Sequence, residues 1–226
     1  MTKEEFNIDD IDLSFYMNFS DQIRHRIVYK LINREKNADF LKGVPYVEYL
    51  DLAIVFYYLL PEKKENEFES ILIQKHHMDM WGIEVSDLMD AASMNTPRLL
   101  GLKIQGILST IAEYLGNDEL LCMAEEEDSY VPMYVATNKL SSNGASVFIY
   151  KDLLEAVAAK LKSDIYIIPS SVHEVIFIRA MKNCQIDIDE VKNMIKEVNT
   201  SEVPEKDVLS DSLYFYSRKE NTICML

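Results

Sequence analysis

The most enzyme-like segment of the chain runs from Pro169 to Glu174 and reads Pro-Ser-Ser-Val-His-Glu. A Ser, a His and an acid act as nucleophile, general base and orienting group when a fold brings them within hydrogen-bond reach. The candidates are Ser171 and His173. In a strand that begins at Val172, however, His173 and Glu174 point to opposite faces, and no GxSxG elbow accompanies the serines. The pattern favours a turn with serine-to-backbone hydrogen bonds that leads into a strand. A hydrolase is the alternative.

His76 and His77 follow a predicted strand, where histidines could ligate a metal. Adjacent side chains diverge in a strand and in a helix, and the chain has no HExxH motif. The sequence therefore predicts a polar helix start here, with no metal and no cofactor. The segment Asn95-Thr96-Pro97-Arg98 is typical of a helix terminator, because a residue before proline avoids the α region. We expect Arg98 to be solvated or paired locally.

Four consecutive acids, Glu125 to Asp128, form a dense cluster of negative charge. The cluster lacks the alternating spacing and the turn glycine of an EF-hand calcium loop. One interpretation is a solvated loop or helix end. The other is a surface for a basic partner, because clustered carboxylates focus a negative potential and speed docking to a positive groove. The contact candidates are then Glu125, Glu126, Glu127 and Asp128.

The charge of the whole chain points in the same direction. The 226 residues contain 38 acids and 23 Lys or Arg, and the net charge is −15. The excess of acids lies in residues 1–20, 117–130 and 187–211. Direct binding of nucleic acid as the main activity is not expected, because phosphate contacts need a basic face. A phosphate-binding glycine loop is also excluded, since the chain has only 6 glycines and no such motif.

The remaining composition predicts a cytoplasmic protein that makes no membrane contact. The N-terminus has no basic stretch before an apolar run, so we expect no signal peptide. The longest apolar run, residues 52–60, is far shorter than the roughly 20 residues of a membrane helix. The three cysteines share no short spacing, which fits a reducing compartment.

Apolar periodicity predicts alternating helices and strands. Helices are expected over 23–32, 84–94, 104–115, 153–161 and 188–198, and strands over 51–60, 68–74, 133–138, 145–150, 164–169, 172–179 and 213–216. Asn143-Gly144 predicts a hairpin between the strands at 133–138 and 145–150. The second half then has the order ββαββαβ. This pattern predicts an α+β fold, with antiparallel sheets and helices packed on one face.

We divide the chain into three parts on this basis. Residues 1–20 form an acidic lead, residues 21–124 form a half with a helix, a β-hairpin and further helices, and residues 125–226 form the ββαββαβ half. The two halves are expected to pack together as one domain.

Several segments resemble an uncharacterised family of bacterial proteins common in gut anaerobes. These segments begin at Arg26, Leu50, Asn95, Met133, Asn143 and Ile168 and read RIVYKLIN, LDLAIVFYY, NTPR, MYVATNK, NGA and IPSSVHEVI. The resemblance covers roughly residues 19–216. It implies a shared fold and no particular activity, and it assigns no functional residues. Family members usually carry a further N-terminal region, which we expect to be absent here or reduced to the acidic lead.

The sequence as a whole predicts a non-enzymatic interaction or regulatory protein with a partner whose surface is basic. A concrete version is an inhibitor that occupies the basic groove of a nucleic-acid-binding protein, by analogy with phage and mobile-element inhibitors of bacterial defence nucleases. Two alternatives stay open. One is a hydrolase that uses Ser171 or His173, with or without a metal, and the other is a scaffold or oligomerisation domain. The sequence does not set the oligomeric state.

Overall fold

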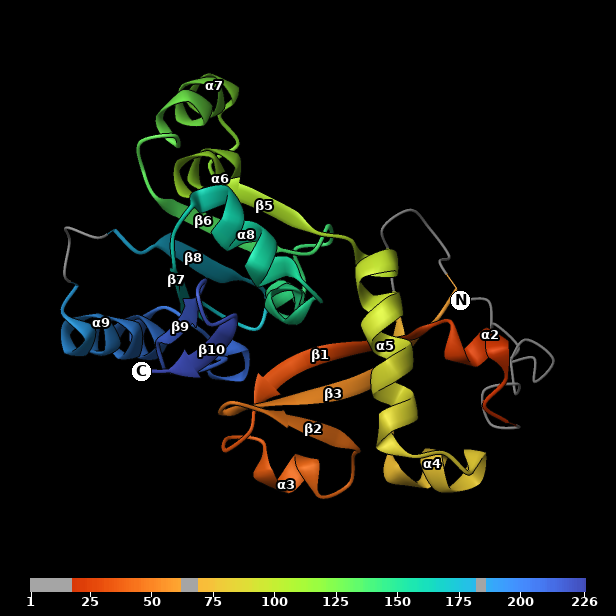
Figure 1. Cartoon of the computed structure of the whole chain (residues 1–226). Coiled ribbons are helices and arrows are strands. Elements are labelled where there is room, and N and C mark those ends of the chain that lie inside the picture. The colour runs from red at the N-terminus through yellow and green to blue at the C-terminus, as the bar shows by residue number, and fades with distance from the viewer. Residues whose placement is uncertain (1–17, 62–68, 182–185) are drawn as a thin grey trace, which may run out of the picture.

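The computed structural model describes residues 18–61, 69–181 and 186–226, and the account below concerns these residues. Two antiparallel sheets, each flanked by helices, make up the molecule (Figure 1). The chain therefore has the α+β class that its sequence predicts.

The smaller sheet comes from the first third of the chain. Its strands are β1 (Ile27–Asn33), β2 (Tyr46–Tyr49), β3 (Leu52–Leu59) and β4 (Ser70–Leu72). β3 is the central strand, because it pairs with β1 and also with both β2 and β4. Seven of its eight residues are buried. The expectation of a buried strand within 51–60 is confirmed.

Four helices accompany this sheet: α2 (Asp21–Arg24), α3 (Ala38–Leu41), α4 (Lys75–Trp81) and α5 (Val85–Leu100). α5 packs against β1 and leads into the second sheet (Figure 1). It does not end before Pro97 as predicted, but continues for three residues beyond it. Contacts with the rest of the fold hold this last turn. Thr96 Oγ1 accepts a hydrogen bond from the Tyr29 amide, and the Asn95 amide donates to the Arg24 and Ile27 carbonyls.

The larger sheet has six antiparallel strands in the order β10-β9-β7-β8-β6-β5. The strands are β5 (Lys103–Gly106), β6 (Met133–Thr137), β7 (Ile165–Ile168), β8 (Val175–Arg179), β9 (Tyr214–Ser217) and β10 (Thr222–Met225). The α-helices of this part are α6 (Ile107–Tyr114), α7 (Asp118–Glu127), α8 (Leu153–Leu161) and α9 (Ile188–Ser201). Two 3₁₀ helices, η2 (Gly144–Ile149) and η3 (Glu205–Asp207), complete it.

Helices cover both faces of the larger sheet. Because successive strand residues point to opposite faces, β7 contributes to two separate clusters. Ile165 and Ile167 pack in the cluster that contains Ala158 of α8. Ile168 packs with Ile195 of α9 on the other face. The sheet therefore differs from the predicted arrangement with helices on one face only.

Two segments predicted as continuous helices are partly strands. Residues 23–32 form the short α2 and then β1, in which Ile27 pairs with Tyr58 of β3. The side chain of Arg26 stabilises this transition from helix to strand, because it donates hydrogen bonds to the carbonyls of Leu59 and Leu60. Residues 104–115 likewise divide into β5 and α6. In both cases, pairing with a distant strand decides the structure over the local helical spacing.

The predicted hairpin at Asn143-Gly144 is wrong. Residues 144–149 form the buried η2, while β6 pairs with β5 and β8. The Asn138 side chain shapes the intervening loop, since its Oδ1 accepts from the Leu140 amide and its Nδ2 donates to the Ser142 carbonyl. The second half therefore lacks one strand of the predicted ββαββαβ order and gains β10 at its end.

Gly144 is held too tightly to accept a side chain. A Cβ atom there would lie 2.1 Å from Thr137 Oγ1 and 2.6 Å from both the Asn138 nitrogen and the His173 oxygen. We expect Gly144→Ala to lower the free energy of unfolding by about 3 kcal/mol, because overpacking against backbone atoms forces the loop to shift. Urea denaturation measures this. Gly43→Ala is the matched control, since its nearest contact would be 3.9 Å away, and a Gly144→Ala protein as stable as this control would contradict the account.

The two sheets share one hydrophobic core. Phe56 of β3, Phe148 of η2 and Phe177 of β8 belong to the same buried cluster. A polar contact also joins the sheets, because Asp51, before β3, accepts hydrogen bonds from Ser210 and Tyr214. The boundary predicted at residue 124 falls inside α7.

Candidate functional site

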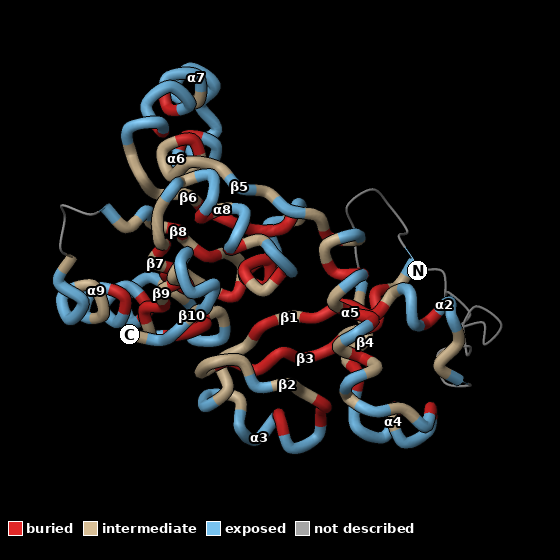
Figure 2. The backbone as a smooth tube through the Cα atoms, in the orientation of Figure 1, coloured by how far each residue is buried: buried red, intermediate tan, exposed pale blue. Residues whose placement is uncertain are grey.

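The predicted acidic cluster lies on a helical hairpin that projects from the end of the larger sheet. Figure 1 shows α6 and α7 stacked beside β5 and β6, away from the smaller sheet. Figure 2 shows that nearly all of α7 is exposed, and Ala124 is its one buried residue. Asn117 caps the start of α7, since its Oδ1 accepts a hydrogen bond from the Leu120 amide at 3.0 Å.

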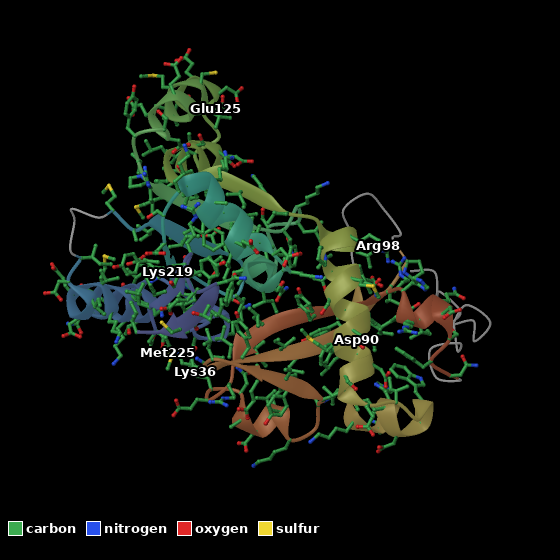
Figure 3. The ribbon with its side chains drawn as sticks, viewed as in Figure 1. Lys36, Asp90, Arg98, Glu125, Lys219 and Met225 are labelled. Atoms are coloured by element: carbon green, nitrogen blue, oxygen red, sulfur yellow. The ribbon has the colours of Figure 1, made fainter. Side chains whose placement is uncertain are left out.

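Glu125, Glu126 and Glu127 occupy the last turn of α7, and all three are exposed. Glu125 is labelled at the outer end of the molecule in Figure 3. The C-terminal end of a helix carries the negative end of its macrodipole, so acids there are unfavourable and bases are favourable. The last turn of α7 contains no basic residue. These three acids therefore lower the stability of α7.

Asp128 has a different role from the three glutamates before it. It is buried, and its two carboxylate oxygens accept hydrogen bonds from the Leu108 and Ser109 amides at 2.9 and 3.2 Å. Asp128 thus satisfies the free amides at the start of α6. Gly106 makes room for it, because a Cβ atom at Gly106 would lie 1.9 Å from the carboxyl carbon. This predicted contact residue is an internal cap of the hairpin.

An apolar groove of about 210 Å³ runs between the two helices of the hairpin. Its lining residues are Leu108, Ile111, Ala112, Leu115, Leu120, Met123, Ala124 and Glu127. Several are highly exposed for apolar side chains: Leu115 by 67%, Met123 by 61% and Ile111 by 50%. Contiguous exposed apolar surface with a polar rim is a mark of an interaction site. The helix predicted over 104–115 includes Ile111 and Leu115 but not Met123, so apolar periodicity did not reveal the groove.

The predicted nucleophile and base are not arranged as a catalytic pair. His173 Nδ1 accepts a hydrogen bond from the Asn143 amide at 3.1 Å, and Nε2 lies 3.5 Å from an Asp207 oxygen. Both ring nitrogens therefore face groups other than a serine hydroxyl. Ser171 Oγ accepts from the His173 backbone amide at 3.0 Å. This is the serine-to-backbone turn that the sequence favours, and β8 begins just after it, at Val175.

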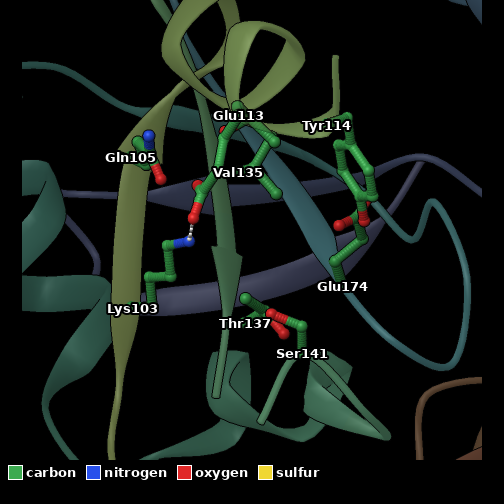
Figure 4. Close-up of a pocket in the computed structure, with 9 residues that line it drawn as sticks. Lys103, Gln105, Glu113, Tyr114, Val135, Thr137, Ser141 and Glu174 are labelled. Atoms are coloured by element: carbon green, nitrogen blue, oxygen red, sulfur yellow. Dashed lines mark hydrogen bonds and ion pairs between the residues drawn. The ribbon is translucent and has the colours of Figure 1, made fainter. Parts of the chain in front are cut away.

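A small polar pocket lies where β5 and β6 meet α6 (Figure 4). Its volume is about 170 Å³, and its lining residues are Lys103, Gln105, Thr110, Glu113, Tyr114, Val135, Thr137, Ser141 and Glu174. Lys103 Nζ donates to both oxygens of Glu113, and this hydrogen bond lowers the pKa of the Glu113 carboxyl. Figure 4 shows that pair on one side and Glu174 beside Tyr114 on the other. Ligand pockets usually measure about 300–1,000 Å³, so the volume argues against a substrate site of ordinary size.

Glu174 is half-buried in this pocket, and no described residue donates a hydrogen bond to its carboxylate. Burial raises the pKa of this carboxyl, and His173 partly opposes that rise. A carboxyl whose pKa is higher in the folded than in the unfolded state favours folding at acid pH. This contribution is lost as the pH rises through the folded pKa.

We expect Glu174→Gln to raise the melting temperature at pH 7. The difference in melting temperature between the two proteins should shrink as the pH falls toward 4.5, the ordinary pKa of the group. A difference between the two proteins that is independent of pH would contradict this.

The remaining polar candidates have local partners. His77 lies in the first turn of α4, where its Nδ1 accepts from the Gln74 amide, so the predicted polar helix start is confirmed. Burial lowers the pKa of His77, and His76 adds to this effect. Arg98 donates to the His25 carbonyl at 2.6 Å and to the Asn95 side chain at 3.0 Å. Arg98 is therefore paired locally, as expected.

With this geometry described, the comparisons with known proteins add one finding. Residues 1–218 match the model of a family of unknown function, DUF5688. The chain belongs to this family. The match begins at residue 1, before the start at residue 19 that the resemblance indicated. No curated protein and no solved structure matches the chain significantly. Within the described part of the chain, no helix is long and apolar enough to cross a membrane.

Proposed function

We propose that this member of DUF5688 is a non-enzymatic interaction protein of the bacterial cytoplasm, and that the α6–α7 hairpin is its binding surface. The observation that supports this proposal is the combination, on one projecting hairpin, of an exposed apolar groove and an acidic rim that forms no ion pair with any described residue. Glu125, Glu126 and Glu127 lie at one end of α7, and Asp118 and Glu119 lie at the other. Residues 117–130 contain no basic residue that would neutralise them.

The chemistry of this surface defines the partner. An amphipathic helix fits a hydrophobic groove by inserting side chains at helical spacing. Carboxylates along the rim favour a helix or surface that also carries Lys and Arg, and they raise its rate of association. A nucleic-acid-binding protein offers such a basic surface. By occupying it, the chain would act as an inhibitor that competes with nucleic acid.

The test is affinity capture from bacterial lysate at low salt, followed by elution with rising salt and mass spectrometry. We expect a basic nucleic-acid-binding protein to elute, and the purified chain to displace a labelled oligonucleotide from that protein. Capture of a protein that keeps its oligonucleotide in the presence of the chain would contradict inhibition.

Light scattering on the purified chain checks the scaffold alternative. A dimer that is broken by Met123→Asp would show that the groove holds a second copy, and it would overturn the proposal.

A further inference from the structure

A second surface of the molecule carries the opposite charge. The ends of α8, β8 and β9 meet at a groove of about 900 Å³. Four basic residues line this groove: Lys162, Arg179, Arg218 and Lys219. Asp164 is the one acid that lines it. The groove therefore has three excess positive charges, although the whole chain has a net charge of −15. Its local electrostatic potential is opposite in sign to that of the chain as a whole.

The four basic side chains have no carboxylate partners among the described residues, although the chain contains 38 acids. The one acid in the groove is otherwise engaged. Asp164 Oδ1 accepts a hydrogen bond from the Arg218 backbone amide at 2.8 Å, and this contact holds the turn between β9 and β10 against the start of β7. The groove therefore presents unpaired positive charge from a fixed backbone. Such an arrangement favours an anionic ligand.

Two aromatic side chains line the same groove. Tyr166 of β7 and Phe215 of β9 are partners in the antiparallel register, and their ring centroids are 5.2 Å apart. Both line the groove and both are only partly buried. Aromatic rings inside a positively charged groove are the features by which proteins hold single-stranded nucleic acid, because unpaired bases stack on the rings while cations follow the phosphates.

We propose that this groove binds single-stranded nucleic acid, with phosphates on Arg179, Arg218 and the two lysines, and with bases on Tyr166 and Phe215. Duplex is disfavoured, because its bases are stacked on one another and cannot reach the rings. The net charge of the chain does not forbid this binding. At about 0.1 M salt the Debye length is about 10 Å, so distant acids are screened while contacts in the groove persist. The proposal does not rest on the α6–α7 hairpin.

Fluorescence anisotropy with a labelled strand of about 12 nucleotides tests the proposal, since single-strand-binding folds cover roughly 4–16 nucleotides. At about 0.1 M salt we expect saturable binding that weakens as salt rises and exceeds the binding of a duplex of the same length. Arg179→Glu with Arg218→Glu should weaken it at least tenfold. Tyr166→Leu, which keeps an apolar side chain and removes the ring, should weaken it about tenfold. Melting temperatures identify any variant that fails to fold.

The matched control reverses two exposed lysines in the turns after β1 and α3, Lys36→Glu and Lys42→Glu, and thus makes the same change in net charge. Figure 3 shows Lys36 beside the smaller sheet and Lys219 on the larger one. We expect this control to bind the strand almost as well as the unmodified chain. Equal weakening by the two charge reversals, or no binding by the unmodified chain, would overturn the proposal. So would groove variants that change only the molecular mass in light scattering, because the groove would then be a contact between copies of the chain.

Discussion

Replacing Glu125, Glu126 and Glu127 by lysine is expected to raise the stability of the chain and to abolish capture of its basic partner. The three acids lie at the negative end of the α7 macrodipole, where a basic residue is favourable by roughly 0.3–1 kcal/mol. We therefore expect a total gain of about 1 kcal/mol and a melting temperature higher by roughly 2–4 °C. Calorimetry and salt-gradient capture measure the two effects on the same protein.

A second triple replacement provides the control for net charge. Asp189→Lys, Glu190→Lys and Glu197→Lys in α9 change the net charge from −15 to −9, as the α7 replacements do, because each adds two charges. Asp189 and Glu190 lie in the first turn of α9, where acids are favourable. This variant should lose stability and keep its partner. Loss of partner from both variants alike would show that overall charge, and not the α7 surface, drives the binding.

Asp51→Ala is expected to lower the free energy of unfolding by at least about 4 kcal/mol. Asp51 accepts hydrogen bonds from the hydroxyls of Ser210, Ser212 and Tyr214, at 2.5, 3.1 and 2.5 Å. Ser210 and Tyr214 are completely buried. Each hydrogen bond to a charged group contributes about 1.5–3 kcal/mol, and a buried hydroxyl left without a partner adds a penalty. Urea denaturation measures the loss.

A double-mutant cycle with Tyr214→Phe separates this contact from other effects of the replacement. Removing the Tyr214 hydroxyl alone should cost about 1–2 kcal/mol. The two replacements together should cost less than the sum of the single ones, because residues in direct contact are coupled. Strict additivity, or a loss below 1 kcal/mol for Asp51→Ala, would show that this contact does not hold the two sheets together.

The parts of the fold that the sequence predicts correctly are those whose local pattern agrees with their tertiary environment. β3 is a continuous apolar run, and it is buried as the central strand. α8 and α9 carry clear helical periodicity and pack it against the larger sheet. β7 and β8, on either side of Ser170-Ser171, also lie where they were expected.

The incorrect predictions arise where distant contacts decide a local choice. Residues 27–32 have helical spacing, but pairing with β3 makes them a strand. Asn143-Gly144 has the sequence of a hairpin turn, but β6 finds its partners in β5 and β8. The Gly144 position is fixed instead by the close approach of Thr137 and His173. Single-sequence patterns do not contain these long-range pairings.

The candidate site was predictable in its charge and not in its shape. Glu125, Glu126 and Glu127 are exposed on α7, and their role as contact residues stays a prediction. Asp128 belongs to the same run of acids, yet it is buried because the start of α6 needs a cap. The groove depends on how α6 and α7 pack as a pair. The basic groove could not be predicted for the same reason, since its residues come from or next to four separate elements, α8, β7, β8 and β9.

Photo-cross-linking from the groove tests the central claim most directly. A photoreactive residue replaces Met123, which is 61% exposed in the α6–α7 groove, or Met225, which is 50% exposed on β10 and serves as the control. After irradiation in bacterial lysate, we expect an adduct with a basic nucleic-acid-binding protein from position 123 and none with that protein from position 225. The α7 lysine replacements should remove the adduct. The same adducts from both positions, or an adduct at position 123 that survives those replacements, would contradict the account.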